Sequence, residues 1–203
     1  MKFKDIQATV IIDLSPDEEH LWKNIDKKER YSTKKAASFG LLFKESENLE
    51  LFYPLYLKTL SRGGIKPASF DGLKSKNGRL FLVYCNNKVI GGVLIRVLKD
   101  KIILLNLASD EDYLNMQVSA FACWSLILWA KRNGFKEFDL GGYQLGAKPG
   151  DKLFNVNRFK EKWGGKIVTY EITSKNPFHI LGRKLVRNFS LFRQLNDKIK
   201  GRR

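Results

Sequence analysis

The sequence predicts an α+β domain in which a mixed, largely antiparallel sheet is flanked by helices. Three observations support this fold class. Short apolar runs typical of strands occur along the chain, other apolar residues recur at helical spacing, and three strand runs at the centre are separated by tight turns. A strand meander followed by a helix and another strand is the order of a mixed sheet covered by helices.

The N-terminal part of the chain predicts two strands and three helices. The strands cover residues 7–13 and 41–44. Helix-start chemistry begins at Ser15, where an N-cap hydroxyl precedes a proline and two acids near the positive end of the helix dipole. Helices are expected through residues 21–25, over 27–37 and over 47–60, and the last of them ends at Arg62-Gly63-Gly64.

The rest of the chain predicts a meander and then alternating helices and strands. The meander strands cover residues 79–85, 88–98 and 101–107. Gly91-Gly92 inside the second strand indicates a bulge or the close approach of another backbone. A long buried helix over 116–133, a strand over 136–140, a helix over 153–162 and a strand over 167–172 complete the order.

The C-terminal segment is a separate feature. We assign residues 1–175 to one domain, because no linker divides them, and residues 176–203 to a basic amphipathic helix. Between His179 and Arg203 there are eight Lys or Arg residues and one acid, beside an apolar stripe of three- and four-residue spacing. Such a helix can dock on its own sheet, lie on an anionic membrane surface or bind nucleic acid.

Composition limits the chemistry. The formal net charge of +16 indicates an anionic partner, namely tRNA, CoA or a phosphate-bearing precursor, with a solvated basic surface as the alternative. The two cysteines lie in apolar patterns and predict buried thiols in a reducing, cytoplasmic compartment. With two distant histidines and no C-x-x-C, the sequence supports neither a metal site nor a Ser-His-Asp or Cys-His nucleophile.

One pair of segments has a pattern suited to chemistry. A predicted strand ends in Asp-Leu-Gly-Gly at residues 139–142, and a later short helix presents Lys160 before a Gly-Gly turn. A fixed ammonium beside exposed backbone amides can hold a phosphate or a developing oxyanion. The alternative is structural: Asp139 accepts amide hydrogens within the turn, while Phe159 and Trp163 pack in the core.

These segments resemble the Fem peptidyltransferases and their relatives among the GNAT acyltransferases. LILWAKRNGFKEFDLGG, and NRFKEKWGGK after it, are similar to the family's W-A-x-x-x-G helix, F-D-x-G strand end and F-K-x-x-[FW]-G segment. Residues 30–40 and 52–64 resemble its R-x-x-x-[KR]-[KR]-A-x-x-x-G and F-Y-x-L-x-x-x-T-x-x-R-x-G stretches. Gly91-Gly92 matches its G-G hairpin, so the resemblance extends over residues 7–172.

The resemblance implies a GNAT-like fold and direct attack of an acceptor amine on a bound acyl ester or thioester. In the family's peptidyltransferases the donor is an aminoacyl-tRNA and the acceptor a cell-wall precursor peptide; in other GNAT relatives the donor is acyl-CoA. The acyl donor is then a co-substrate, with no tightly bound cofactor. The family's F-K pair assigns Phe159 and Lys160 as catalytic candidates. The substrate-binding candidates are Arg30, Lys34, Arg62, Asp139, Gly141 and Gly142.

Two departures from the family pattern qualify this assignment. Fem peptidyltransferases carry two GNAT-like halves, whereas this chain has the length of one, so a homodimer is an arrangement that would supply a second half. The CoA-binding Q/R-x-x-G-x-G/A loop is replaced by residues 109–113, which contain three acids. Because carboxylates repel phosphate, we expect acyl-CoA to bind poorly there.

The sequence therefore predicts an acyltransferase acting on an amine, with a cell-wall or lipid-linked precursor as the expected acceptor. Peripheral contact with the inner face of the membrane through the C-terminal helix would suit such an acceptor. Two alternatives stay open. One is a non-catalytic binding domain for RNA or an anionic membrane, and the other is an acyl-CoA-dependent N-acyltransferase. For the three basic candidates Arg30, Lys34 and Arg62, a solvated helix charge is the competing interpretation.

Overall fold

The computed structural model describes residues 3–174, so the predicted C-terminal helix and its membrane contact lie outside the described residues and stay predictions. The first half of the described chain consists of β1 (Phe3–Asp13), α1 (Glu18–Asn24), α2 (Lys27–Ala37), β2 (Leu42–Ser46), α3 (Leu49–Arg62), α4 (Phe70–Lys74) and β3 (Arg79–Cys85). The second half consists of β4 (Lys88–Val97), β5 (Lys101–Ser109), the 3-10 helix η1 (Glu111–Met116), α5 (Val118–Arg132), β6 (Glu137–Tyr143), α6 (Lys152–Glu161) and β7 (Lys166–Ser174).

The strands form one mixed sheet, which confirms the predicted α+β class. Their order is β2-β3-β4-β5-β6-β1-β7. The meander pairs antiparallel from β2 through β5, whereas β5 and β6 pair in parallel, because α5 connects them as a crossover. Short turns join β3 to β4 and β4 to β5, and Asn86 and Asn87 of the β3–β4 turn both have positive φ angles.

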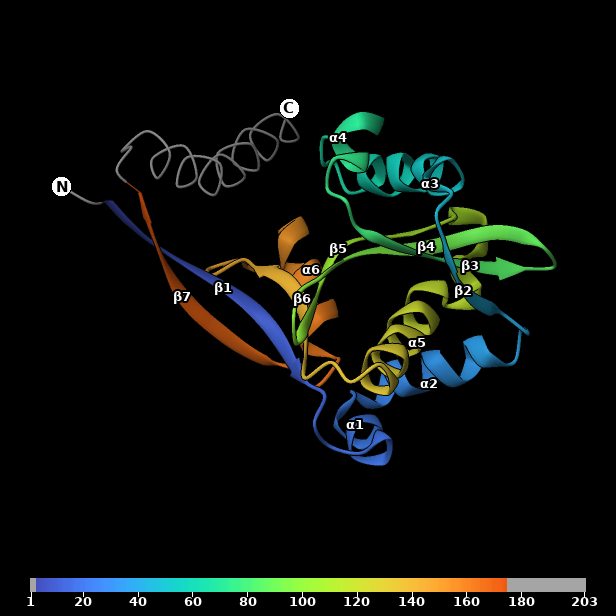
Figure 1. Cartoon of the computed structure of the whole chain (residues 1–203), viewed down its shortest axis with the longest axis horizontal. Helices are drawn as coiled ribbons and strands as arrows, with labels where there is room; N and C mark the ends of the chain where they lie inside the picture. The colour runs from blue at the N-terminus through green and yellow to red at the C-terminus, as the bar shows by residue number, and fades with distance from the viewer. Residues whose placement is uncertain (1–2, 175–203) are drawn as a thin grey trace, which may run out of the picture. The chain divides into compact units, whose positions relative to one another are not determined.

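Helices cover both faces of the central strands (Figure 1). Helices α2 and α5 lie on one face, where Ala36, Ala122 and Leu126 share a buried cluster with Phe81 and Val93. Helices α3 and α4 lie on the other face, where a second cluster contains Phe52, Leu55, Leu73, Leu82 and Leu94. The alternation of apolar residues along β3 and β4 supplies both clusters, as expected for strands buried on two sides.

The glycine pair in β4 makes this two-sided packing close. A Cβ on Gly91 would lie 2.5 Å from Cγ1 of Val118 in α5. A Cβ on Gly92 would lie 3.0 Å from Cδ2 of Phe52 in α3. The register with β3 also shifts beside Gly91, so the predicted bulge and close approach are both present.

Three elements differ from the sequence prediction. The helix expected from residue 116 begins at Val118, because Gln117 adopts a left-handed conformation (φ 57°, ψ 38°) that separates η1 from α5. The short helix α4 was not predicted; Ser69 caps it by accepting from the Gly72 N–H. Strand β1 starts at Phe3, four residues before the expected residue 7.

By its contacts the chain divides into two units. One is Thr9–Val168, which holds the elements of both clusters; the other combines Met1–Ala8 with Thr169–Arg203. In the described part of the smaller unit, Lys4 Nζ lies 3.0 Å from Glu171 Oε1. The predicted boundary between residues 175 and 176 lies at the edge of the described chain and stays a prediction. Among the described residues, no helix has the length and apolar character needed to cross a bilayer.

Candidate active site

The two parallel strands β5 and β6 stay paired over only part of their length. Their ladder joins Lys101 to Glu137, Ile102 to Phe138 and Ile103 to Asp139. Beyond this point residues 104–107 of β5 are half-buried, although β5 lies in the interior of the sheet. The register with β4 also shifts between Leu94 and Ile95. We call residues 104–107 the open stretch of β5, since an interior strand that lacks full cover can receive a ligand.

Strand β6 continues to Tyr143, so Asp-Leu-Gly-Gly lies inside the strand, and the strand end predicted there is wrong. Asp139 of this segment is buried. Its Oδ1 accepts hydrogen bonds from the Gly141 N–H (2.8 Å) and from the Thr9 hydroxyl of β1, and its Oδ2 lies 3.9 Å from Lys101 Nζ. Gly141 has a φ of +78°, and a Cβ there would lie 3.1 Å from the Leu104 carbonyl oxygen. Asp139 thus positions a backbone turn within β6 that only glycine fits easily, against the open stretch of β5.

Lys160 extends from α6 to the same turn. Its side chain is buried, and Nζ donates to the Gly142 carbonyl oxygen at 2.6 Å. Nζ also lies 3.8 Å from the position that a Cβ on Gly141 would occupy. Burial lowers the pKa of Lys160 to about 8, and the charge of Asp139 acts in the opposite direction. Lys160 can therefore exchange a proton near neutral pH, which an ordinary lysine does not do.

Two further side chains of α6 hold Lys160 in place. Asn157 is buried; its Oδ1 accepts from the Gln144 N–H (3.0 Å) and its Nδ2 donates to the Gln144 carbonyl (2.8 Å). One turn later Glu161 Oε1 accepts a 2.6 Å hydrogen bond from the Tyr143 hydroxyl, which raises the pKa of Tyr143. These three hydrogen bonds tie α6 to Tyr143, the last residue of β6, and to Gln144 after it. Lys160 lies between Asn157 and Glu161, so its position has little freedom.

The structure brings four of the eight candidates together and separates the others. Lys160, Asp139, Gly141 and Gly142 share the turn, and Asp139 accepts an amide hydrogen there as the structural alternative expects. Phe159 packs edge-on against Trp163 with ring centroids 6.1 Å apart. Phe159 therefore packs against the core, whereas Lys160, the next residue of α6, contacts the backbone turn of β6.

The three basic candidates lie in other contacts. Arg30 donates from Nη1 to the Lys23 carbonyl oxygen at 2.7 Å and so caps the end of α1. Lys34 is exposed on α2. Arg62 lies 4.0 Å from Glu111. Within the described part of the chain, no hydrogen bond or ion pair joins any of them to Lys160 or Asp139, so their substrate-binding role stays a prediction.

Sequence reasoning missed Thr9, Lys101, Asn157 and Glu161. The first two come from strands distant in sequence, and only the sheet order brings them to Asp139. Asn157 carried a signal, because its spacing of three from Lys160 and four from Glu161 makes it a neighbour of both on the surface of one short helix.

The acidic turn after β5 has its own partners. Asp110 is buried and lies 3.9 Å from Lys88 Nζ, and its side chain caps η1. Glu111 is the partner of Arg62. These carboxylates stand between β5 and the start of α5, where a phosphate would otherwise meet helix N–H groups. The turn is therefore a poor phosphate cradle by its charge.

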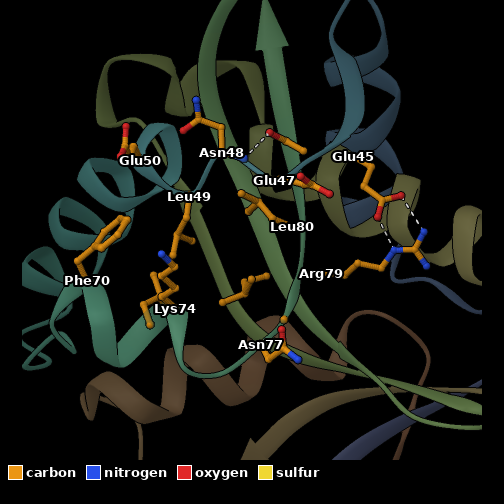
Figure 2. Close-up of a pocket in the computed structure, with 14 residues that line it drawn as sticks. Glu45, Glu47, Asn48, Leu49, Glu50, Phe70, Lys74, Asn77, Arg79 and Leu80 are labelled. Atoms are coloured by element: carbon orange, nitrogen blue, oxygen red, sulfur yellow. Dashed lines mark hydrogen bonds and ion pairs between the residues drawn. The ribbon is translucent and has the colours of Figure 1, made fainter.

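A surface pocket of about 640 Å³ lies elsewhere, between β2, β3 and the starts of α3 and α4 (Figure 2). Glu45, Glu47 and Glu50 are among its lining residues, and Glu45 Oε2 accepts from Arg79 Nη2 at 2.8 Å. The pocket shares no lining residue with the Lys160 turn. It is a separate hollow and contributes no group to that site.

The fold places Lys160 and Asp139 in a mixed sheet beside the point where its parallel strands β5 and β6 part. Residues 27–161 match the acetyltransferase (GNAT) domain family, so the chain belongs to that family of acyltransferases. Among curated proteins none matches the sequence.

Solved structures show the same fold. FemX is similar with a TM-score of 0.72 and 14% identity over 86% of this chain. L-PGS from Bacillus licheniformis is similar with a TM-score of 0.63 and 15% identity over 93% of this chain. The chain covers 63% of the FemX chain and 66% of the L-PGS chain, so it spans less than two thirds of either protein. At these identities the likeness establishes the fold, which is the one expected from the resemblance.

Proposed function

We propose that this protein transfers an acyl or aminoacyl group from a phosphate-bearing donor to an amine, at the backbone turn of β6 that Lys160 contacts. The observation that carries the proposal is the buried Lys160, whose pKa is lowered to about 8 and which donates to Gly142 where β6 has parted from its parallel neighbour β5. A proton-exchanging group fixed beside an opening in the sheet suits acyl transfer.

The reaction needs no covalent intermediate. The acceptor nitrogen forms a bond to the donor carbonyl carbon while the bond from that carbon to the leaving oxygen or sulfur breaks. The nitrogen loses one proton and the leaving atom gains one. Lys160, as an ammonium, stabilises charge on the carbonyl oxygen and supplies the proton to the leaving atom, and solvent then restores it.

Aminoacyl-tRNA is the donor that the charges of this protein support best. The net charge of +16 suits a polyanion, while the acidic turn before α5 opposes the binding of CoA pyrophosphate. FemX has a similar fold, and the resemblance of the sequence to the Fem peptidyltransferases implies this donor. A cell-wall or lipid-linked amine is the proposed acceptor, in keeping with peripheral membrane contact through the predicted C-terminal helix.

A donor screen tests the proposal. Labelled aminoacyl-tRNA and acetyl-CoA are each incubated with amine acceptors and the wild-type protein, Lys160→Met, or Lys160→Arg. Lys160→Met should lower the turnover rate about a hundredfold or more, because both the charge and the proton are lost. Lys160→Arg keeps the charge but does not release a proton near neutral pH, so it separates the two roles.

Lys58→Met is the matched control. Lys58 is exposed on α3, so the substitution removes the same charge from a surface position. Its turnover should equal that of the wild type. Transfer that persists in folded Lys160→Met would contradict the proposal. Binding of tRNA without transfer to any amine would favour the non-catalytic binding domain instead.

A further inference from the structure

The loop between α4 and β3 passes directly over β4. Asn77 has a φ of 46°, and Gly78 follows it. A Cβ on Gly78 would lie 2.7 Å from the Ile95 carbonyl oxygen and 2.9 Å from Cδ1 of Leu94. The loop can approach β4 this closely because Gly78 has no side chain. Asn77 of this loop is visible at the base of the pocket in Figure 2.

Lys76 reaches from this loop to the open stretch of β5. Its Nζ donates to Asn106 Oδ1 at 3.1 Å, and the bond is partly buried. Asn106 pairs with Leu94 across the sheet. With Oδ1 fixed as the acceptor, the Nδ2 group of Asn106 is oriented as a donor, and within residues 3–174 it donates to no protein group.

Arg96 adds a second positive charge on the same face. It lies two residues beyond Leu94 on β4, so alternation along the strand places both side chains on the side that faces α3 and α4. Desolvation lowers the pKa of Lys76, and the charge of Arg96 lowers it further. In the described part of the chain, no carboxylate lies within ion-pair distance of Lys76 or Arg96.

We propose that Lys76, Arg96 and the Asn106 amide form an anion subsite that takes a phosphate group of the donor. Lys76 and Asn106 are in contact beside the open stretch of β5, and Arg96 lies on the same face of the sheet. Two cations and an oriented N–H donor match the charge and the acceptor atoms of a phosphate. The inference rests on the proposed function for the identity of the donor. Phosphodiesters of tRNA and the pyrophosphate of CoA share this chemistry, and the experiment distinguishes them.

The test uses Asn106→Asp in the full-length protein. The substitution keeps the shape of the side chain and the acceptor for Lys76, but it replaces the N–H donor with a negative charge. Calorimetric titration with inorganic pyrophosphate, uncharged tRNA and CoA should show at least about tenfold weaker pyrophosphate binding, because a hydrogen bond to a charged group is lost and repulsion is added. The tRNA and CoA titrations show which donor class uses the subsite, since only that one weakens in parallel.

A structural role predicts a different result. If the Lys76–Asn106 bond only anchors the loop, Asn106→Asp strengthens the anchor and leaves pyrophosphate affinity unchanged, which would overturn the proposal. Wild-type protein that binds none of the three probes would overturn it as well. Lys74→Met removes a neighbouring exposed charge and should stay within about twofold of the wild type.

The outcome is separable from that of the proposed function. If transfer depends on Lys160 but Asn106→Asp binds pyrophosphate as the wild type does, the subsite is contradicted and the proposed function is supported. If Asn106→Asp binds pyrophosphate more weakly but the wild-type protein transfers no group from any donor, the subsite is supported and the proposed function is contradicted.

Discussion

Lys160 is the residue at which the proposed chemistry and the stability of this protein oppose each other. Its side chain is buried beside one carbonyl oxygen and near one carboxylate. The protonated form therefore loses more solvation than these partners restore, and its pKa falls to about 8. The same burial that destabilises the ammonium makes its proton available to a reaction.

A pH-dependent contribution to stability follows for Lys160. Its folded pKa of about 8 lies below the ordinary value of 10.5, so the unfolded chain binds more protons between these values and stability rises with pH across this interval. The slope approaches about 1.4 kcal/mol per pH unit. Urea unfolding at two pH values in this window should show the gain in the wild type and its loss in Lys160→Met. Equal gains in the two proteins would contradict the lowered pKa.

The contacts of Asp139 show what a local sequence pattern can and cannot predict. The Asp-Leu-Gly-Gly string correctly predicted a carboxylate that accepts an amide hydrogen, but it wrongly predicted a strand end, because β6 continues to Tyr143. The string contained no sign of Thr9 or Lys101, because those residues approach Asp139 from β1 and β5. Cross-strand partners depend on sheet order, which local patterns do not encode.

At the scale of elements, the sequence predicted best those helices and strands that have a long periodic apolar pattern or clear capping and turn residues at their ends. The boundaries expected for α2 and β3 agree with the structure. Helix α4 escaped prediction because five residues are too few to display a period. The break before α5 depends on the left-handed Gln117, a conformation that a non-glycine residue adopts only when its surroundings stabilise it.

Strand β4 offers a test of element packing through Gly91. A methyl group added by Gly91→Ala would lie 2.5 Å from Val118 Cγ1 and 3.0 Å from the Ala108 carbonyl oxygen. Because α5 would have to move or Val118 to rotate, the free energy of unfolding should fall by about 1–3 kcal/mol. Gly142→Ala, which meets no atom within 4 Å, should change it by less than about 0.5 kcal/mol. Equal denaturant midpoints for the two variants would show that α5 does not pack closely on Gly91.

At the scale of the whole molecule, the net charge of +16 makes a prediction about salt. If the partner is tRNA, several phosphates are neutralised at once and their counterions are released. A plot of log affinity against log salt concentration should have a slope of about −3 or steeper for tRNA, measured by filter binding. CoA carries fewer charges and should give a shallower slope. Affinity for tRNA that is independent of salt would contradict a role for the net charge.

The sequence by itself determined the α+β class, the order of the main elements and the short helix that carries Lys160. These depend on local periodicity, on glycine positions and on a motif that is continuous along the chain. Only the tertiary structure decided that Arg30 is engaged at the end of α1, that Arg62 lies near Glu111, that Thr9 joins Asp139, and that Lys76 meets Asn106. The last three contacts connect residues at least 30 positions apart, which local patterns do not encode, and the contact of Thr9 with Asp139 depends on the order of the strands in the sheet.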